Sequence, residues 1–176
     1  MGTTVVLRSR SSRVIGGSTV AISVAALVSA AFDGVDVLLA FGGPLALLGL
    51  LGWAGFWRPY VEVSDGGVTV VNTLRTVTVP WPAVQEVEGR YGLRLRTAYG
   101  AVTAWAASAP SGRQRARGED SASARAVNAR LGELRAAGYL DDPRLEQSEL
   151  RTTWHRPVIA AAAVLVVASA VLPLFA

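Results

Sequence analysis

The chain has 176 residues, of which 51% are hydrophobic and 17% charged, and its formal net charge is +4. It contains no Cys and a single His, which excludes disulfides, thiol nucleophiles, Cys-ligated metals and multi-His metal sites. All seventeen basic residues are Arg, and they do not form the dense basic stripe that is typical of nucleic-acid binders. We therefore expect no nucleic-acid partner, no metal and no cofactor.

Three apolar runs frame the chain, at residues 14–32, 35–57 and 158–176. Each has about 20 residues, enough to cross the hydrocarbon core of a bilayer as a helix. The turn Phe32-Asp33-Gly34-Val35 separates the first two runs, so we expect them to form a helical hairpin. The pattern predicts a multi-pass membrane protein whose first partner is the lipid bilayer.

Basic residues flank only one end of each apolar run. The turn between the first two runs holds Asp33 and Asp36 and no Arg. Under the positive-inside rule, the N-terminal tail and residues 58–156 then lie in the cytoplasm, and the C-terminus lies outside. The residues on which this orientation depends are Arg8, Arg10, Arg13, Arg58, Arg151 and Arg156.

Aromatic residues gather at the same predicted membrane surface, where rings with a polar edge are enriched. Arg-Pro pairs at Arg58 and Arg156 mark the two places where the chain leaves or rejoins the membrane. The predicted membrane-interface anchors are Trp53, Trp57, Arg58, Tyr60, Trp154 and Arg156.

Two alternatives remain open for the first two runs. An Arg-rich segment precedes the first run, and Val28-Ser29-Ala30 resembles a cleavage site, which would make it a signal peptide. We favour an uncleaved span because the run is long and a second span follows closely. Small residues also recur along both spans, and we favour packing within the hairpin over homodimerisation. These small residues are Gly17, Ala21, Ala25, Ser29, Gly42, Ala46, Gly49 and Gly52.

Between the second and third runs the apolar period changes to two, which is typical of half-buried strands. Asp65-Gly66-Gly67 signals a tight turn, and Pro80 and Pro82 end a later strand. We expect a meander of about six antiparallel strands, at residues 60–64, 68–72, 76–79, 83–90 (with a bulge), 91–96 and 101–106.

A polar, Arg-rich connector at 110–120 is predicted to be mobile, and a helix is predicted at 121–138. In this helix Ala124, Val127, Leu131 and Leu134 recur at three- and four-residue spacing, which predicts one apolar stripe packed on the sheet. The expected organisation is a basic tail (1–13), a transmembrane hairpin (14–57), a β domain (58–109), the linker (110–120), the amphipathic helix (121–138), a membrane-proximal segment (139–157) and a third transmembrane helix (158–176).

The order of these motifs resembles a known bacterial family. The motifs are Trp57-Arg58-Pro59-Tyr60, Val61-Glu62-Val63-Ser64-Asp65-Gly66-Gly67-Val68, Asn72 through Arg75, Val79-Pro80-Trp81 and Val84-Gln85-Glu86-Val87. Over roughly residues 35–106 the chain looks like the pleckstrin-homology-like (PH-like) domain of the actinobacterial low-molecular-weight protein antigen family. The resemblance implies a bacterial membrane hairpin followed by a small cytoplasmic PH-like sheet with a closing helix, an α+β domain.

The family's fold has seven strands and a closing helix, whereas six strands are evident here, and the third span is not part of its basic pattern. Eukaryotic domains of this fold often hold inositol phosphates through basic residues near the first hairpin loop. Here that loop is Ser64-Asp65-Gly66-Gly67, which is acidic. We therefore expect no specific phosphoinositide binding.

No arrangement of side chains indicates catalysis. His155 lies between Trp154 and Arg156, and we interpret it as an interfacial residue rather than a general base. Glu86 and Glu88 share one face of a strand, and we interpret that face as solvated rather than as an acid–base pair. The chain is therefore predicted not to be an enzyme.

A cluster of Arg residues is the remaining candidate for lipid or partner contact. Arg94 and Arg96 lie on one side of a predicted strand, with Arg90 nearby. They would bind anionic head groups if that side faced the bilayer, but we favour a solvated face. The sequence predicts a domain for protein interaction, self-association or membrane-proximal assembly, with an accessory subunit of a transport or envelope-synthesis complex, acting through its helices, as the alternative.

Overall fold

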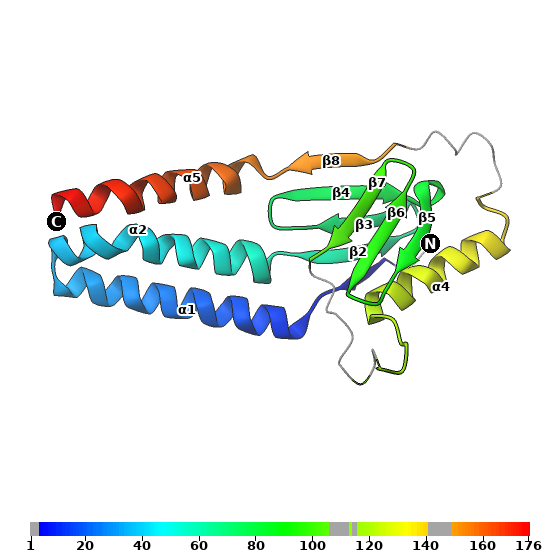
Figure 1. The fold of residues 1–176 in the computed structure, drawn as a ribbon, viewed down its shortest axis with the longest axis horizontal. Coiled ribbons are helices and arrows are strands. Elements are labelled where there is room, and N and C mark those ends of the chain that lie inside the picture. The colour runs from blue at the N-terminus through cyan, green and yellow to red at the C-terminus, as the bar shows by residue number, and fades with distance from the viewer. Residues whose placement is uncertain (1–3, 106–112, 114–115, 141–148) are drawn as a thin grey trace. The chain divides into compact units, whose positions relative to one another are not determined.

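A computed structural model of the protein describes residues 4–105, 113, 116–140 and 149–176. The chain divides into two compact units. We call residues 10–58 and 155–176 the span unit, and residues 1–9 and 59–154 the sheet domain. Figure 1 shows both, with helices α1, α2 and α5 in the first and the strands with α4 in the second.

The span unit contains three helices that are long and apolar enough to cross a membrane. They are α1 (Arg10–Asp33), α2 (Val35–Gly52) continued by the π-helix η1 (Trp53–Trp57), and α5 (Arg156–Val171) continued by the 3-10 helix η4 (Leu172–Phe175). The turn between α1 and α2 depends on Gly34, whose φ of 129° is readily adopted only by glycine. The helix α2 continues through Pro44.

Small residues bring the three helices close together. A Cβ atom at Gly52 would lie 2.7 Å from the Thr19 side chain, and one at Gly43 would lie 2.9 Å from the Ser169 Cα. The Ser23 hydroxyl is buried and donates a hydrogen bond across the hairpin to the Leu45 carbonyl. These contacts agree with packing inside the hairpin, and they also seat α5 against α2.

The sheet domain is built from two antiparallel sheets. The five-stranded sheet has the order β1-β2-β3-β4-β8 and the three-stranded sheet the order β5-β6-β7. In Figure 1 the strands β5–β7 cross β2–β4 at a steep angle. The bounds are β1 Val5–Leu7, β2 Tyr60–Ser64, β3 Gly67–Val71, β4 Arg75–Pro80, β5 Val84–Glu88, β6 Leu93–Thr97, β7 Gly100–Ala104 and β8 Arg151–Trp154, with a 3-10 turn η2 at Trp81–Ala83.

The inward faces of both sheets form one apolar core. Alternation buries Val61 and Val63 of β2, Leu93 and Leu95 of β6, and the corresponding residues of the other central strands. Trp81 is 2% exposed, and its Nε1 donates to the Ser64 carbonyl at 2.9 Å. Burial of the whole indole with its one polar atom paired makes Trp81 the largest single contributor to this core.

Helix α4 (Ala122–Ala136) packs against β2, β5 and β6. The structure buries the whole stripe that the sequence predicted for it: Ala124, Val127, Leu131 and Leu134. Ser121 caps the helix by accepting a hydrogen bond from the Ala124 amide at 3.1 Å. The helix ends before Gly138, whose φ of 71° stops it in the expected way.

The six strands expected between residues 60 and 106 correspond to β2–β7, and the bulge expected in the fourth lies between Val84 and Glu86. Two strands were not expected. The tail assigned to residues 1–13 contributes β1, which pairs with β2, and the membrane-proximal segment 139–157 contributes β8, which pairs with β4. The first and third helices also begin before the predicted spans, at Arg10 and Arg156. Of the linker predicted to be mobile at 110–120, residues 110–112 and 114–115 lie outside the described residues.

Candidate functional site: a groove beside helix α4

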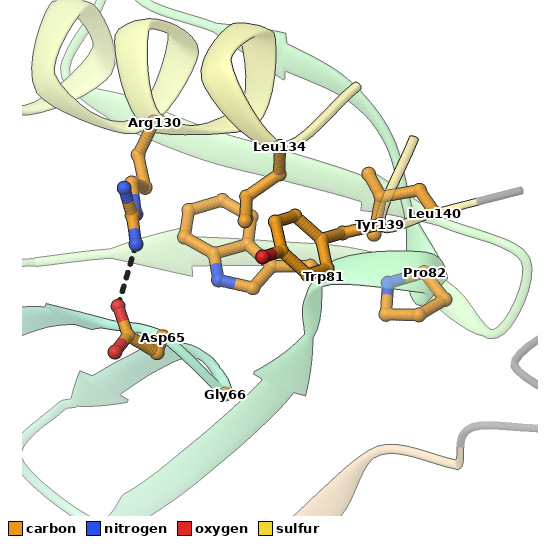
Figure 2. A pocket seen from close by; sticks show the side chains of 8 residues that line it. All are labelled: Asp65, Gly66, Trp81, Pro82, Arg130, Leu134, Tyr139 and Leu140. Atoms are coloured by element: carbon orange, nitrogen blue, oxygen red, sulfur yellow. Dashed lines mark hydrogen bonds and ion pairs between the residues drawn. The ribbon is translucent and has the colours of Figure 1, made fainter. Parts of the chain in front are cut away.

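A groove of about 490 Å³ opens between α4, the β2–β3 turn and the 3-10 turn η2. Figure 2 shows Leu134 projecting from α4 toward the indole of Trp81, and Arg130 projecting from the same helix toward Asp65. The residues that line the groove are Asp65, Gly66, Trp81, Pro82, Arg130, Leu134, Tyr139 and Leu140. This volume is in the range of ligand pockets, and most of the lining is apolar.

One wall of the groove is exposed and the other belongs to the core. Tyr139 is 70% exposed, whereas Trp81 and Leu134 are buried. Leu140 is partly buried against the core cluster. The Gly138 turn that ends α4 places Tyr139 and Leu140 beside Pro82, as Figure 2 shows. The groove thus offers an accessible aromatic ring on a fixed apolar floor.

An ion pair closes one side of the groove. The Arg130 guanidinium lies 2.6 Å from the Asp65 carboxylate on the β2–β3 turn and 2.8 Å from the Glu133 carboxylate on its own helix. Hydrogen bonds to Glu133 and to Asp65 raise the pKa of Arg130 above its ordinary value. Arg130 is therefore charged at all working pH values, and it ties the α4 helix to the β2–β3 turn.

The groove combines an apolar lining with a few polar side chains. Its described lining residues include no His, Cys, Ser or Thr. Among the described residues of the chain, no group of three His, Cys, Asp or Glu side chains could hold a metal ion. An aromatic and aliphatic surface with a charged pair at its rim is typical of a protein-binding patch.

The predicted Arg cluster lies elsewhere in the sheet domain. Arg94 and Arg96 project from the same exposed face of β6 and pair with the carboxylates of β5. Arg96 lies 3.7 Å from Glu86 and also pairs with Glu88, and Arg94 lies 3.8 Å from Glu88. Their charges are thus largely balanced within the β5–β6 pair.

Arg90 lies outside this ion-pair network. It follows β5, and its guanidinium lies 5.6 Å from the ring centre of Tyr91. It shares a shallow hollow with Arg94 and Glu88, and Arg96 is not among the residues that line this hollow.

The six predicted anchor residues are divided between the two units. In the span unit, the guanidinium of Arg58 lies 5.6 Å from the ring centre of Trp53, and that of Arg13 lies 5.0 Å from the ring centre of Trp57. Arg156 is the exposed first residue of α5.

In the sheet domain, the anchors Tyr60 and Trp154 each pair with an Arg. The guanidinium of Arg8 lies 4.7 Å from the Tyr60 ring centre, and that of Arg75 lies 5.8 Å from the Trp154 ring centre. Cation–π contacts of this kind are worth about 0.5–1 kcal/mol at exposed sites.

His155 is 8% exposed and precedes α5, where its carbonyl accepts hydrogen bonds from the amides of Val158 and Ile159. The carboxylate pair Glu86 and Glu88 faces the Arg side chains of β6. His155, Glu86 and Glu88 are therefore not among the described residues that line the groove beside α4.

Residues 58–163 match a family model described as a bacterial PH domain. The chain belongs to this family. The matched range runs from Arg58 through β2–β8 and α4 and ends within α5, so the prediction of a PH-like domain is confirmed. Comparisons with curated proteins and with solved structures found no match.

Sequence reasoning missed the groove of this PH domain. Asp65 and Arg130 are 65 positions apart, and no local pattern shows that their side chains meet. A weak signal was present in Tyr139 and Leu140, two apolar residues that directly follow the predicted helix stop at Gly138.

Proposed function

We propose that this chain is a non-enzymatic integral protein of the bacterial plasma membrane, whose cytoplasmic PH domain binds a protein partner or mediates membrane-proximal assembly. The groove beside α4 carries this proposal, because it joins an exposed Tyr139 to a fixed apolar floor and a charged rim. Exposed aromatic rings in such settings are frequent anchors of protein interfaces.

The orientation is part of the same proposal. Arg10 and Arg13 begin α1, Arg58 follows η1 and Arg156 begins α5, whereas Asp33 and Asp36 flank the α1–α2 turn. This charge asymmetry supports a cytoplasmic N-terminus and PH domain, with the α1–α2 turn and the C-terminus outside.

Two finer assignments belong here as well. The motifs between residues 35 and 106 support membership of the actinobacterial low-molecular-weight protein antigen type. The acidic β2–β3 turn, where Asp65 is already paired with Arg130, supports the absence of specific phosphoinositide binding.

A second candidate function is an accessory subunit of a transport or envelope-synthesis complex that acts through its helices. A small-residue face free for another protein would favour it. Gly43, Gly49 and Gly52, however, already meet α5 or α1 within the span unit. This packing favours the PH domain, rather than the helices, as the part of the protein that binds a partner.

Photocrosslinking in living cells tests the interaction. A benzoylphenylalanine replacing Tyr139 should give a discrete crosslinked protein, and the same substitution at Tyr99 should not. Tyr99 is a matched control, because it is also an exposed aromatic of the PH domain and lies outside the groove. The crosslink should disappear when Leu140 is changed to Asp. Equal crosslinking from positions 139 and 99, or none from 139, would contradict the proposal.

A further inference from the structure

One end of the five-stranded sheet gathers the strands that lead to the membrane helices. The register places Leu7 of β1, Tyr60 of β2 and Trp154 of β8 at the end that carries the β3–β4 turn. Only one or two residues separate each of them from α1, η1 or α5. Since a residue spans at most about 3.6 Å, the covalent chain tethers this end of the sheet to the helices at three points.

The same end exposes three large apolar side chains. Trp105 is 70% exposed, Trp154 is 54% exposed and Leu74 is 46% exposed. They line a hollow of about 360 Å³ together with Asn72, Arg75 and neighbouring residues of β7. Large apolar side chains grouped in this way are unusual on a water-exposed surface.

The position of Trp105 is fixed by a buried side chain. Asn72 is 7% exposed. Its Nδ2 donates to the Thr103 carbonyl at 2.8 Å, and its Oδ1 accepts from the Trp105 amide at 2.9 Å. An exposed indole on a braced backbone loses little conformational entropy when it binds a surface.

The charge of this end favours an anionic partner. The segments at this end, residues 7–8, 60–61, 71–76, 103–105 and 152–154, contain Arg8 and Arg75 and no acidic residue. The opposite end of the same sheet carries Asp65. Arg75 also lies over the Trp154 ring, so a cation and an indole are presented together.

We propose that Leu74, Trp105 and Trp154, with Arg75, form a surface that binds the head-group region of the bilayer that the helices cross. Trp is enriched at this depth, and each Arg near an anionic surface gains attraction from its lipids. The tether raises the effective concentration of lipid at this surface. The inference rests on the membrane-spanning part of the proposed function and not on the groove beside α4.

The test uses the full-length protein in vesicles of phosphatidylcholine and phosphatidylglycerol. Because the chain has no Cys, a dye can be attached at Thr103→Cys, which lies in the hollow, or at Gly66→Cys as a control. A Cβ at Gly66 meets no atom within 4 Å, and Gly66 lies at the opposite end of the sheet. Quenching by head-group nitroxide lipid should be strong at position 103 and weak at position 66.

Two variants in the Thr103→Cys background sharpen the result. The quenching at position 103 reports the ratio of molecules whose surface is bound to lipid to molecules whose surface is free. Arg75→Gln should lower this ratio about fivefold in anionic vesicles and leave it unchanged in pure phosphatidylcholine. Trp105→Ser should lower it about tenfold or more in both. Equal quenching at positions 103 and 66 would overturn the inference. It would also be overturned if the dye at position 103 were shielded from solvent only in native membranes, because that result would indicate that a protein occupies the surface.

Carbonate extraction separates this inference from the function on which it rests. Release of the protein from the vesicles would refute the membrane spans and with them both proposals. Retention of the protein without quenching at position 103 would refute the lipid surface alone.

Discussion

Asn72 joins the two sheets of the PH domain through its amide side chain. It directly follows the β3 strand, and its hydrogen bonds to Thr103 and Trp105 run to the end of β7. The side chain thereby replaces the backbone pairing that β3 and β7 lack, since they belong to different sheets. Its place in the sequence motif thus has a structural explanation that involves no ligand.

Asn72→Ala should destabilise the PH domain by about 2–3 kcal/mol, because two hydrogen bonds are lost and buried backbone groups remain unpaired. The thermal midpoint of the detergent-solubilised protein, followed by near-UV circular dichroism, measures the effect. Asn128→Ala is the matched control. Asn128 is exposed on α4, so its replacement should be neutral or slightly stabilising. Equal midpoints for the two variants would contradict the bridging role.

The two adjacent glycines of the β2–β3 turn should differ strongly in their response to replacement by Ala. Gly67 has a φ of 152°, and a Cβ there would lie 2.3 Å from the Val79 carbonyl oxygen, whereas a Cβ at Gly66 meets open space. Gly67→Ala should cost about 3 kcal/mol or more through strain and backbone displacement. Gly66→Ala should stay within about 1 kcal/mol of the parent protein. Urea titration of both variants, compared with the parent, checks the difference.

At the scale of elements, the predictable features are those with a local pattern. The α4 stripe and the β2–β3 turn follow from spacing and from Gly residues, and both are present. The edge strands β1 and β8 have three and four residues, and all four residues of β8 are exposed. They form strands because β2 and β4 offer unpaired backbone groups. No local sequence pattern predicts this pairing, since it depends on strands that are distant in the sequence.

The start of α4 depends on one hydroxyl group. Ser121 is 1% exposed; it accepts from the Ala124 amide and donates to the Gly92 carbonyl at 2.9 Å. Ser121→Ala should therefore cost about 2 kcal/mol, since it removes both the helix cap and the link to the β5–β6 turn. Ala129→Ser on the exposed side of α4 should change stability by less than about 0.5 kcal/mol. Thermal unfolding of the two variants distinguishes the cap from a general effect on the helix.

Neighbouring glycines in α2 offer a similar comparison in the span unit. A Cβ at Gly43 would lie 2.8 Å from the Ser169 amide nitrogen, whereas a Cβ at Gly42 makes only an ordinary contact with Leu38 of its own helix. Gly43→Ala should separate α5 from α2 and destabilise the span unit by about 1–3 kcal/mol. Gly42→Ala should not. Fluorescence-detected size exclusion after heating in mild detergent measures the difference, and an unchanged Gly43→Ala would show that α5 does not pack there.

At the scale of the whole molecule, the sequence determined the class of protein better than its sites. Apolar length predicted three spans, and a period of two predicted the antiparallel strands, because both signals are local. The groove required Asp65, Trp81 and Arg130 to meet from three separate segments. Likewise the ion pairs of Arg94 and Arg96 with β5 depend on strand register, which single-strand patterns do not specify.

The central claim is that the PH domain lies in the cytoplasm, and thiol labelling tests it most directly. Because the chain has no Cys, Tyr99→Cys and Asp36→Cys can each be probed with a membrane-impermeant maleimide in right-side-out and inverted vesicles. Both positions are exposed in the structure. We predict labelling of position 36 only in right-side-out vesicles and of position 99 only in inverted ones. The reverse pattern, or labelling of both positions from the same side, would contradict the account.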